Sequence, residues 1–213
     1  NNAVLVLAGD IDAAQARPLV EKYFGAIKRG PVNVPAAADV PTLPAPRTIV
    51  MKDRVAATRI IRNWAVPGLL SPQLAALDVG GSVLGGLASS RLDNILVREE
   101  KLAVAVTAGL QPFHRIGMFE VTATVKPGVD PALVEKRLDA IIAELIANGP
   151  TEDEVQRSAM REVSGRIRGL EQVGGFGGKA VTLAEGQVYA GKSDFYKSTL
   201  DQYAGIGPAE VKA

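Results

Sequence analysis

The sequence contains no cysteine, and His114 is its only histidine among 213 residues. Without cysteine the chain forms no disulfide and offers no thiol nucleophile, no iron–sulfur ligand and no cysteine-ligated zinc site. A single imidazole also excludes every metal site built on two histidines, and any serine–histidine relay would have to use His114. These absences remove most designs of metalloenzyme and of covalent hydrolase.

Strong net charge and long apolar runs are also lacking. Lys plus Arg number 24 and Asp plus Glu 23, which leaves a net charge of +1 and no field that attracts phosphates, so we expect no nucleic-acid partner. No stretch approaches the roughly 18 apolar residues of a spanning helix, so we expect no membrane insertion. The composition, 47% hydrophobic and 22% charged, is that of a globular chain with a real core.

The first part of the chain predicts a strand–helix unit over residues 1–30. Residues 3–8 are an uninterrupted apolar run, typical of a buried strand, and Asp12 is placed to cap the helix that follows. Pro18 lies inside this helix and predicts a kink or a later start. Residues 31–46 contain five prolines and predict an extended crossover linker that reaches about 50 Å.

Residues 47–213 predict the main domain, which forms one structural domain with residues 1–30. The glycines at 80, 81, 85 and 86 predict a close approach of another backbone to a helix. Alternation places Val104 and Val106 on the inner face of a strand. The pattern predicts an α+β fold, a mostly antiparallel sheet with helices packed on one face. The predicted strands are 48–53, 58–65, 104–110 and 119–125, and the predicted helices begin near 71, 90, 130 and 151, with a helical remainder.

Three stretches carry a resemblance to a known family. They are Asn-Ala-Val-Leu-Val-Leu-Ala-Gly-Asp-Ile-Asp at 2–12, Leu-Gly-Gly-Leu-Ala-Ser-Ser-Arg-Leu at 84–92 and Val-Arg-Glu-Glu-Lys-Leu-Ala-Val-Ala-Val at 97–106. With the order of elements, they make the chain resemble the zinc metallopeptidase family that includes pitrilysin, insulin-degrading enzyme and the mitochondrial processing peptidase. The part resembled is the non-catalytic, C-terminal-type domain.

The resemblance implies a division of labour. The catalytic half of this family carries His-x-x-Glu-His, in which two imidazoles bind zinc and the glutamate deprotonates the bound water. That motif is absent here. We therefore expect no catalytic residue, no metal ligand and no cofactor in this chain, which would be inactive alone, and we expect zinc in a partner half in the same or another chain.

By the same resemblance, the chain would enclose or bind an unfolded peptide substrate and support the zinc-bearing half in metal-dependent proteolysis. The alternative is a scaffold or peptide-binding interaction domain with no role in proteolysis. Family analogy favours the periplasm or cell envelope of a bacterium. The strand–helix unit and the linker also suggest that a preceding half has been removed.

The resemblance also marks residues that would contact substrate. Ser89, Ser90 and Arg91 stand in the matched Ser-Ser-Arg-Leu run, and Arg98 follows seven residues later, on roughly the same helix face. The alternative for both arginines is a solvated face without a specific partner. Val97 and Val104 occupy positions where substrate-binding relatives often have Arg and Tyr, so the resemblance implies no direct assistance to the transition state.

Overall fold

A computed structural model describes residues 3–31, 34 and 37–213 of the chain. These residues divide into two compact units. We call residues 38–161 with 203–213 the sheet unit, and residues 1–37 with 162–202 the helical unit. One antiparallel sheet and several helices confirm the predicted α+β class.

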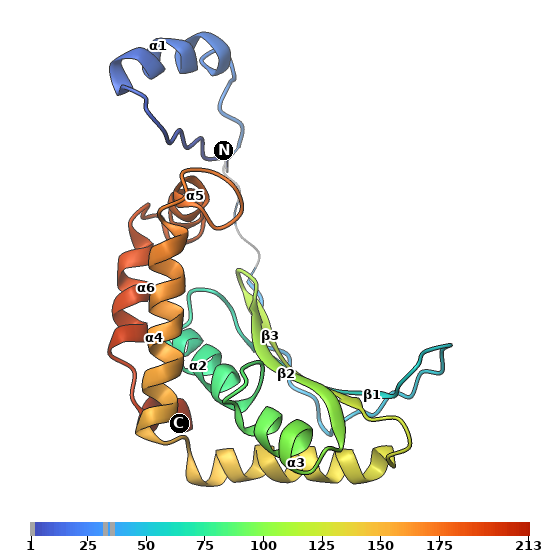
Figure 1. Cartoon of the computed structure of the whole chain (residues 1–213). Helices are drawn as coiled ribbons and strands as arrows, with labels where there is room; N and C mark the ends of the chain where they lie inside the picture. The colour runs from blue at the N-terminus through green and yellow to red at the C-terminus, as the bar shows by residue number, and fades with distance from the viewer. Residues whose placement is uncertain (1–2, 32–33, 35–36) are drawn as a thin grey trace. The chain divides into compact units, whose positions relative to one another are not determined.

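The sheet has three strands in the order β1-β3-β2. β1 spans Arg59–Pro67, β2 spans Ala103–Pro112 and β3 spans Ile116–Val125. β3 is the central strand and pairs with both neighbours in antiparallel register (Figure 1). Both β1 and β2 are therefore edge strands.

Helices follow the strands much as the sequence predicts. In the sheet unit they are α2, the π-helical η1, α3, α7 and the beginning of α4; in the helical unit they are α1, α5, most of α6 and the end of α4. Within the described residues, no helix has both the length and the apolar character to cross a membrane. The bounds are α1 Ala13–Phe24, α2 Leu74–Leu84, η1 Asp93–Glu99, α3 Pro131–Asn148, α4 Glu152–Gly169, α5 Lys179–Ala190, α6 Phe195–Ala204 and α7 Pro208–Lys212.

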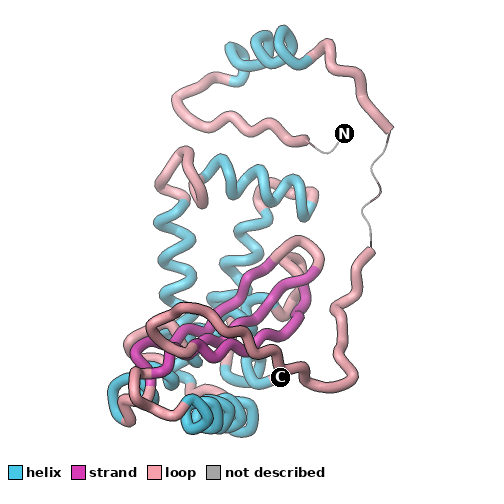
Figure 2. Tube along the Cα trace, turned by 90° about the vertical axis from the view of Figure 1, so that its right-hand side faces the viewer, coloured by secondary structure: helices cyan, strands magenta, loops and turns pink. Residues whose placement is uncertain are grey.

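The helices of the sheet unit cover one face of the sheet. Val121 and Ala123 of β3 are fully buried against Leu138 of α3 and the other core side chains. Residues of opposite parity point away from this core, and Figure 2 shows the three strands running side by side. We call that second surface the open sheet face. Its side chains include those of Arg59, Ile61, Asn63, Ala65, Ala105, Thr107, Gln111, Ile116, Met118, Glu120, Thr122 and Thr124.

Two glycines let α2 touch β2, which confirms the predicted close approach. A Cβ atom added at Gly81 would lie 3.1 Å from the Cα atom of Gly109. One added at Gly85 would lie 2.8 Å from the backbone nitrogen of Ala108. Only residues without a side chain permit such backbone proximity.

Gly85→Ala is expected to lower the free energy of unfolding by about 1–3 kcal/mol, because the methyl group would overlap the β2 backbone. Gly80→Ala is the matched control: its Cβ atom would meet Val211 Cγ1 at 3.4 Å, an ordinary contact, and alanine favours the helix. The control should be neutral or stabilising by up to about 1 kcal/mol. Urea unfolding followed by circular dichroism compares the two, and equal losses would contradict this packing.

Capping hydrogen bonds are present at two of the predicted helix starts. The Asp12 carboxylate accepts a hydrogen bond from the backbone N–H of Ala14 and caps α1. Asp130 caps α3 in the same way through the N–H of Ala132. These local hydrogen bonds explain why the helix starts could be predicted.

The predicted strand at residues 3–8 is wrong for this chain. The predicted later start of the following helix, near Pro18, is also wrong. α1 starts at Ala13 and continues through Pro18. Residues 3–8 have no regular structure, and Leu5 and Leu7 are about half exposed. A helix satisfies its own backbone hydrogen bonds, but a strand requires a neighbour, and none of the described strands pairs with this segment.

The predicted strand at residues 48–53 is wrong for the same reason, since this segment has no strand partner and Val50 is largely exposed. The inward position of Val104 is also wrong. A bulge between Ala103 and Ala105 shifts the register, so that Ala103 and Val106 are buried and Val104 is 51% exposed.

The predicted boundaries of the strand–helix unit, the linker and the main domain stay predictions. Residues 32–33 and 35–36 of the linker lie outside the described residues. The described linker positions contain neither helix nor strand.

Candidate functional site

The predicted substrate-contact residues begin in the turn after α2. Ser90 is almost fully buried there, at 2% exposure. Its hydroxyl donates to the carbonyl oxygen of Ser82 at 2.7 Å and accepts from the backbone N–H of Leu87 at 3.1 Å. The Ser90 side chain therefore holds the turn to the last turn of α2.

Arg91 forms a two-pronged ion pair with Glu154 of α4. Its Nε and Nη2 atoms donate to the two carboxylate oxygens at 2.8 and 2.7 Å, and Nη2 also donates to the Gly149 carbonyl oxygen at 3.2 Å. Both side chains are only 18% exposed. The pair joins the residues just before η1 to the first turn of α4, 63 positions further along the sequence.

The carboxylate of Glu154 accepts hydrogen bonds from two residues. It accepts from Arg91 and from both the backbone N–H and the hydroxyl of Thr151, in a capping box at the start of α4. The hydrogen bonds from Arg91, then those from Thr151, lower the pKa of Glu154 from 4.5 to about 2, although burial acts in the opposite direction. Glu154 is thus bound as a carboxylate and is not placed to serve as a base.

Ser89 and Arg98 are the two predicted contact residues with exposed side chains. The Nε atom of Arg98 pairs with the Asp93 carboxylate at 3.1 Å, and both residues lie on η1. The backbone hydrogen bonds of this π-helix join residues five apart, for example from the N–H of Glu100 to the carbonyl oxygen of Ile95. Contact with substrate stays a prediction for all four residues. Ser90 and Arg91 already have partners inside the fold, and the four do not share one surface because Ser90 is buried.

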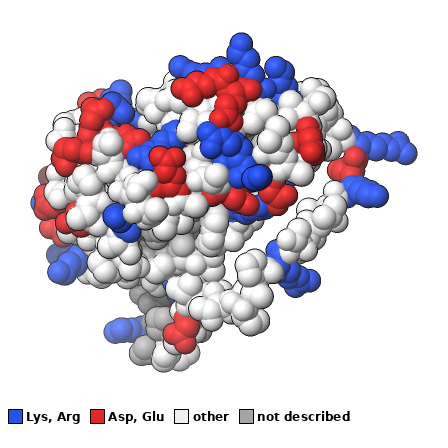
Figure 3. Space-filling view, turned by 90° about the horizontal axis from the view of Figure 1, so that it is seen from below, with Lys and Arg blue, Asp and Glu red and all other residues white. Residues whose placement is uncertain are grey.

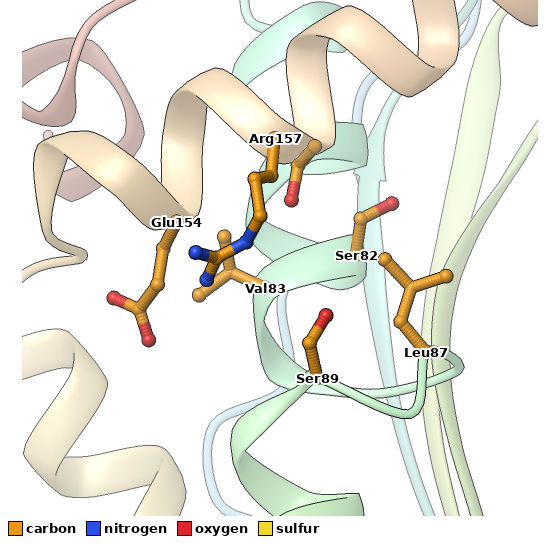
Figure 4. A pocket seen from close by; sticks show the side chains of 7 residues that line it. Ser82, Val83, Leu87, Ser89, Glu154 and Arg157 are labelled. Atoms are coloured by element: carbon orange, nitrogen blue, oxygen red, sulfur yellow. The ribbon is translucent and has the colours of Figure 1, made fainter.

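A small pocket lies beside Ser89. Figure 4 shows Arg157 reaching from α4 toward α2 and the turn that carries Ser89. The volume of this pocket is about 10 Å³, at the lower limit for one water molecule. A cavity of this size has no room for a peptide side chain. It is lined by Ser82, Val83, Leu87, Ser89, Glu154, Arg157 and Ser158.

Acidic and basic side chains alternate over α3 and its surroundings. Arg62 of β1 pairs with both Asp139 and Glu135 of α3. The hydrogen bonds to these carboxylates raise the pKa of the guanidinium above its ordinary value. Arg137 of α3 pairs with Glu100. Figure 3 shows the two signs interspersed on the surface seen from below. This surface offers no concentrated positive patch for a polyanion.

Zinc, which the family resemblance implies for a catalytic half, does not fit the donors of this chain. Among the described residues, no group of three or more His, Cys, Asp and Glu side chains is placed to hold a metal ion. The one histidine of the sequence, His114, lies in the connection between β2 and β3. No zinc-dependent step is therefore assigned to residues of this chain.

The fold and the donor set together define an α+β domain whose described residues hold no metal-ligand cluster. The family model described as "Peptidase M16 inactive domain" matches residues 1–161. The chain belongs to this family of inactive domains of zinc proteases, which confirms the predicted non-catalytic relationship.

Two curated relatives are zinc proteases. The chain is 22% identical over 203 residues to zinc protease PqqE of Helicobacter pylori and 26% identical over 212 residues to an uncharacterised zinc protease of Mycobacterium leprae. The matches cover 94% and 99% of this chain but 46% and 47% of the relatives. The chain thus spans about half the length of the curated relatives that it matches.

Solved structures share the fold. A protease from Helicobacter pylori has a TM-score of 0.77 at 20% identity, with 96% of this chain and 49% of that chain covered. The peptidase M16 inactive domain from Pseudomonas fluorescens has a TM-score of 0.72 at 19% identity, with 96% and 47% covered. The periplasmic protease PqqL from Escherichia coli has a TM-score of 0.71 at 15% identity, with 96% of this chain and 22% of that chain covered.

Proposed function

We propose that this chain is the non-catalytic half of a zinc protease, which holds a peptide substrate while a zinc-bearing half, in the same or another chain, hydrolyses it. Membership of the inactive-domain family supports the division of labour. So does the length of the two curated zinc proteases, which have about as many residues again outside the match. The sequence has one histidine and no cysteine, and its described residues contain no cluster of possible zinc ligands, which supports hydrolysis by the other half.

The open sheet face is the observation that carries the peptide-holding role. Asn63, Thr107 and Gln111 are exposed on it, and Thr122 is half-buried. Amide and hydroxyl groups both donate and accept hydrogen bonds, so they suit the backbone of an extended peptide and do not select a charge. Glu120 and Arg59 also lie on this face, so its polar side chains are mostly but not all uncharged.

Such a surface would accelerate hydrolysis by positioning. A peptide held beside a zinc site meets the reactive water without a new bimolecular encounter. The open sheet face supplies hydrogen bonds and shape to that end, and the attacking water and its activation belong to the zinc-bearing half.

Thr107→Trp is expected to weaken binding of an unstructured, fluorescently labelled peptide by at least about tenfold, because the indole, on β2 opposite Thr122 of the central strand, would cover part of the open sheet face. Thr48→Trp, at an exposed position outside the sheet, is the matched control and should bind like the wild type. Fluorescence anisotropy of the chain with its zinc-bearing half measures both affinities. Unchanged affinity in Thr107→Trp, with a native circular dichroism spectrum, would remove this face from the proposal.

A further inference from the structure

Glu120 places one carboxylate in the middle of the open sheet face. It lies on β3, which runs between β1 and β2 (Figure 1). Its register partners are Asn63 of β1 and Gly109 of β2. The residues next to it on this face, along β3 and across to both edge strands, are all uncharged. They are Ile61, Asn63, Ala65, Thr107, Gly109, Gln111, Met118 and Thr122.

The Glu120 side chain is half-buried, and its hydrogen bonding is incomplete. Its Oε1 atom accepts from the Thr122 hydroxyl at 3.2 Å, and no Lys or Arg of the described residues forms an ion pair with it. The other charged side chain of the face, Arg59, lies opposite Thr124, roughly 13 Å along β3 from Glu120. A carboxylate accepts up to about four hydrogen bonds, so Glu120 retains the capacity to bind a cationic donor from outside the chain.

Gly109 leaves open space beside this carboxylate. A Cβ atom added at Gly109 would meet no atom within 4 Å outside its own neighbours in the chain. Thr107 and Gln111, which flank it on the same face of β2, are both exposed. The close packing of α2 does not account for this glycine, because a side chain here would point to the open sheet face and away from the helix. The space can therefore take a side chain of a bound peptide next to Glu120.

We propose that the open sheet face selects peptides with a basic side chain, whose cationic group is bound by Glu120 in the space above Gly109. The inference rests on the proposed function and names the class of substrate that this face prefers. Arginine should bind better than lysine, because a guanidinium can donate two parallel hydrogen bonds to one carboxylate. The exposed amides of Asn63 and Gln111 remain available to the peptide backbone.

Fluorescence anisotropy tests this preference with the chain, its zinc-bearing half and a chelator that prevents cleavage. The probes are labelled, unstructured peptides with an acetylated amino terminus, identical except for arginine, lysine, glutamine or glutamate at one central position. The arginine peptide should bind at least about tenfold more tightly than the glutamine peptide. The glutamate peptide should bind most weakly, because like charges repel.

Three variants locate the preference at the carboxylate. Glu120→Gln should reduce the affinity of the arginine peptide to that of the glutamine peptide, whose own affinity should not change. Glu120→Arg should reverse the preference, so that the glutamate peptide binds best. Glu185→Gln, the same change at an exposed position of α5, is the matched control and should keep the wild-type preference. A native circular dichroism spectrum of each variant shows that the fold is retained.

Gly109→Val tests the space separately from the charge. The valine side chain would occupy the room between Thr107 and Gln111 and leave the Glu120 carboxylate intact. Valine is well suited to a strand, so the variant should fold. The arginine peptide should lose most of its advantage over the glutamine peptide. An undiminished preference for arginine would show that the cation is bound outside this space, which would contradict the proposal.

The outcomes separate this inference from the proposed function. If the wild-type mixture binds all four peptides equally and cleaves them once zinc is restored, the inference is wrong and the proposed function stands. The inference is also wrong if the preference for arginine survives Glu120→Gln. If the arginine preference depends on Glu120 but the chain never increases cleavage, the inference stands and the proposed function fails. If no peptide binds, both fail.

A free amino terminus is the other cation that a peptide can offer to Glu120. A glutamine peptide without the acetyl group tests it directly. If this peptide binds the wild type as tightly as the acetylated arginine peptide does, and loses that affinity in Glu120→Gln, the carboxylate binds the terminus and the proposed selection of a basic side chain is overturned.

Discussion

Adding this chain to its zinc-bearing half is expected to raise kcat/KM for an unstructured peptide by at least about tenfold, because the peptide is then held beside the zinc site and no longer meets it in free solution. The chain alone should show no cleavage, since it has a single histidine and no cysteine. The measurement is the rate of cleavage of a quenched fluorescent peptide as the chain is titrated into a fixed amount of the zinc-bearing half.

A chelator provides the control for that titration. Removing zinc should abolish cleavage by the mixture, and it should leave the thermal unfolding of the isolated chain unchanged, because its described residues contain no metal-ligand cluster. Cleavage by the isolated chain, lost on chelation and restored by zinc, would show that the division of labour is wrong.

Glu154→Gln is expected to lower the free energy of unfolding at pH 7 by about 2–3 kcal/mol, because it leaves the largely buried Arg91 guanidinium without its carboxylate. Glu152→Gln is the matched control: this glutamate is exposed in the same turn of α4, and its loss should cost less than about 0.5 kcal/mol. Urea unfolding followed by circular dichroism measures both variants.

The effect of Glu154→Gln should also depend on pH. The pKa of Glu154 is about 2 in the folded chain and 4.5 when the side chain has no partners, as in the unfolded state. As the pH falls, the unfolded state therefore binds the proton first. The stability that the carboxylate supplies is complete above about pH 4.5 and is lost as the pH drops from there toward 2. The difference between wild type and variant should therefore shrink over that range, and a difference independent of pH would contradict the role of the ion pair.

Local patterns in the sequence were sufficient for the helices of this fold. Asp12, Asp130 and the pair Thr151 and Glu154 each act within three residues of their own position, so their effect can be read without knowledge of the fold. The two strands of the β2–β3 hairpin were also predictable from alternation. The bulge that exposes Val104 was not, because it depends on register against β3.

Contacts between distant segments account for what the sequence could not provide. Arg91 could be placed in a family-like run, but its partner Glu154 lies 63 residues away, and nothing in either segment indicates the other. Ser90 is likewise buried by an acceptor in α2 that only the folded turn brings near. The apolar run at 3–8 has a strand's composition, but strand formation depends on a neighbour that this chain does not contain among its described residues.

The most direct test of the peptide-holding role is site-specific photo-crosslinking in the cleaving mixture of the chain, its zinc-bearing half and a peptide. A photoreactive side chain at Thr107 should crosslink the peptide, and one at the exposed Lys136 of α3, on the helix-covered side, should not. Crosslinks at Lys136 and none at Thr107 would contradict the account, because the peptide would then lie against the helices and not on the open sheet face.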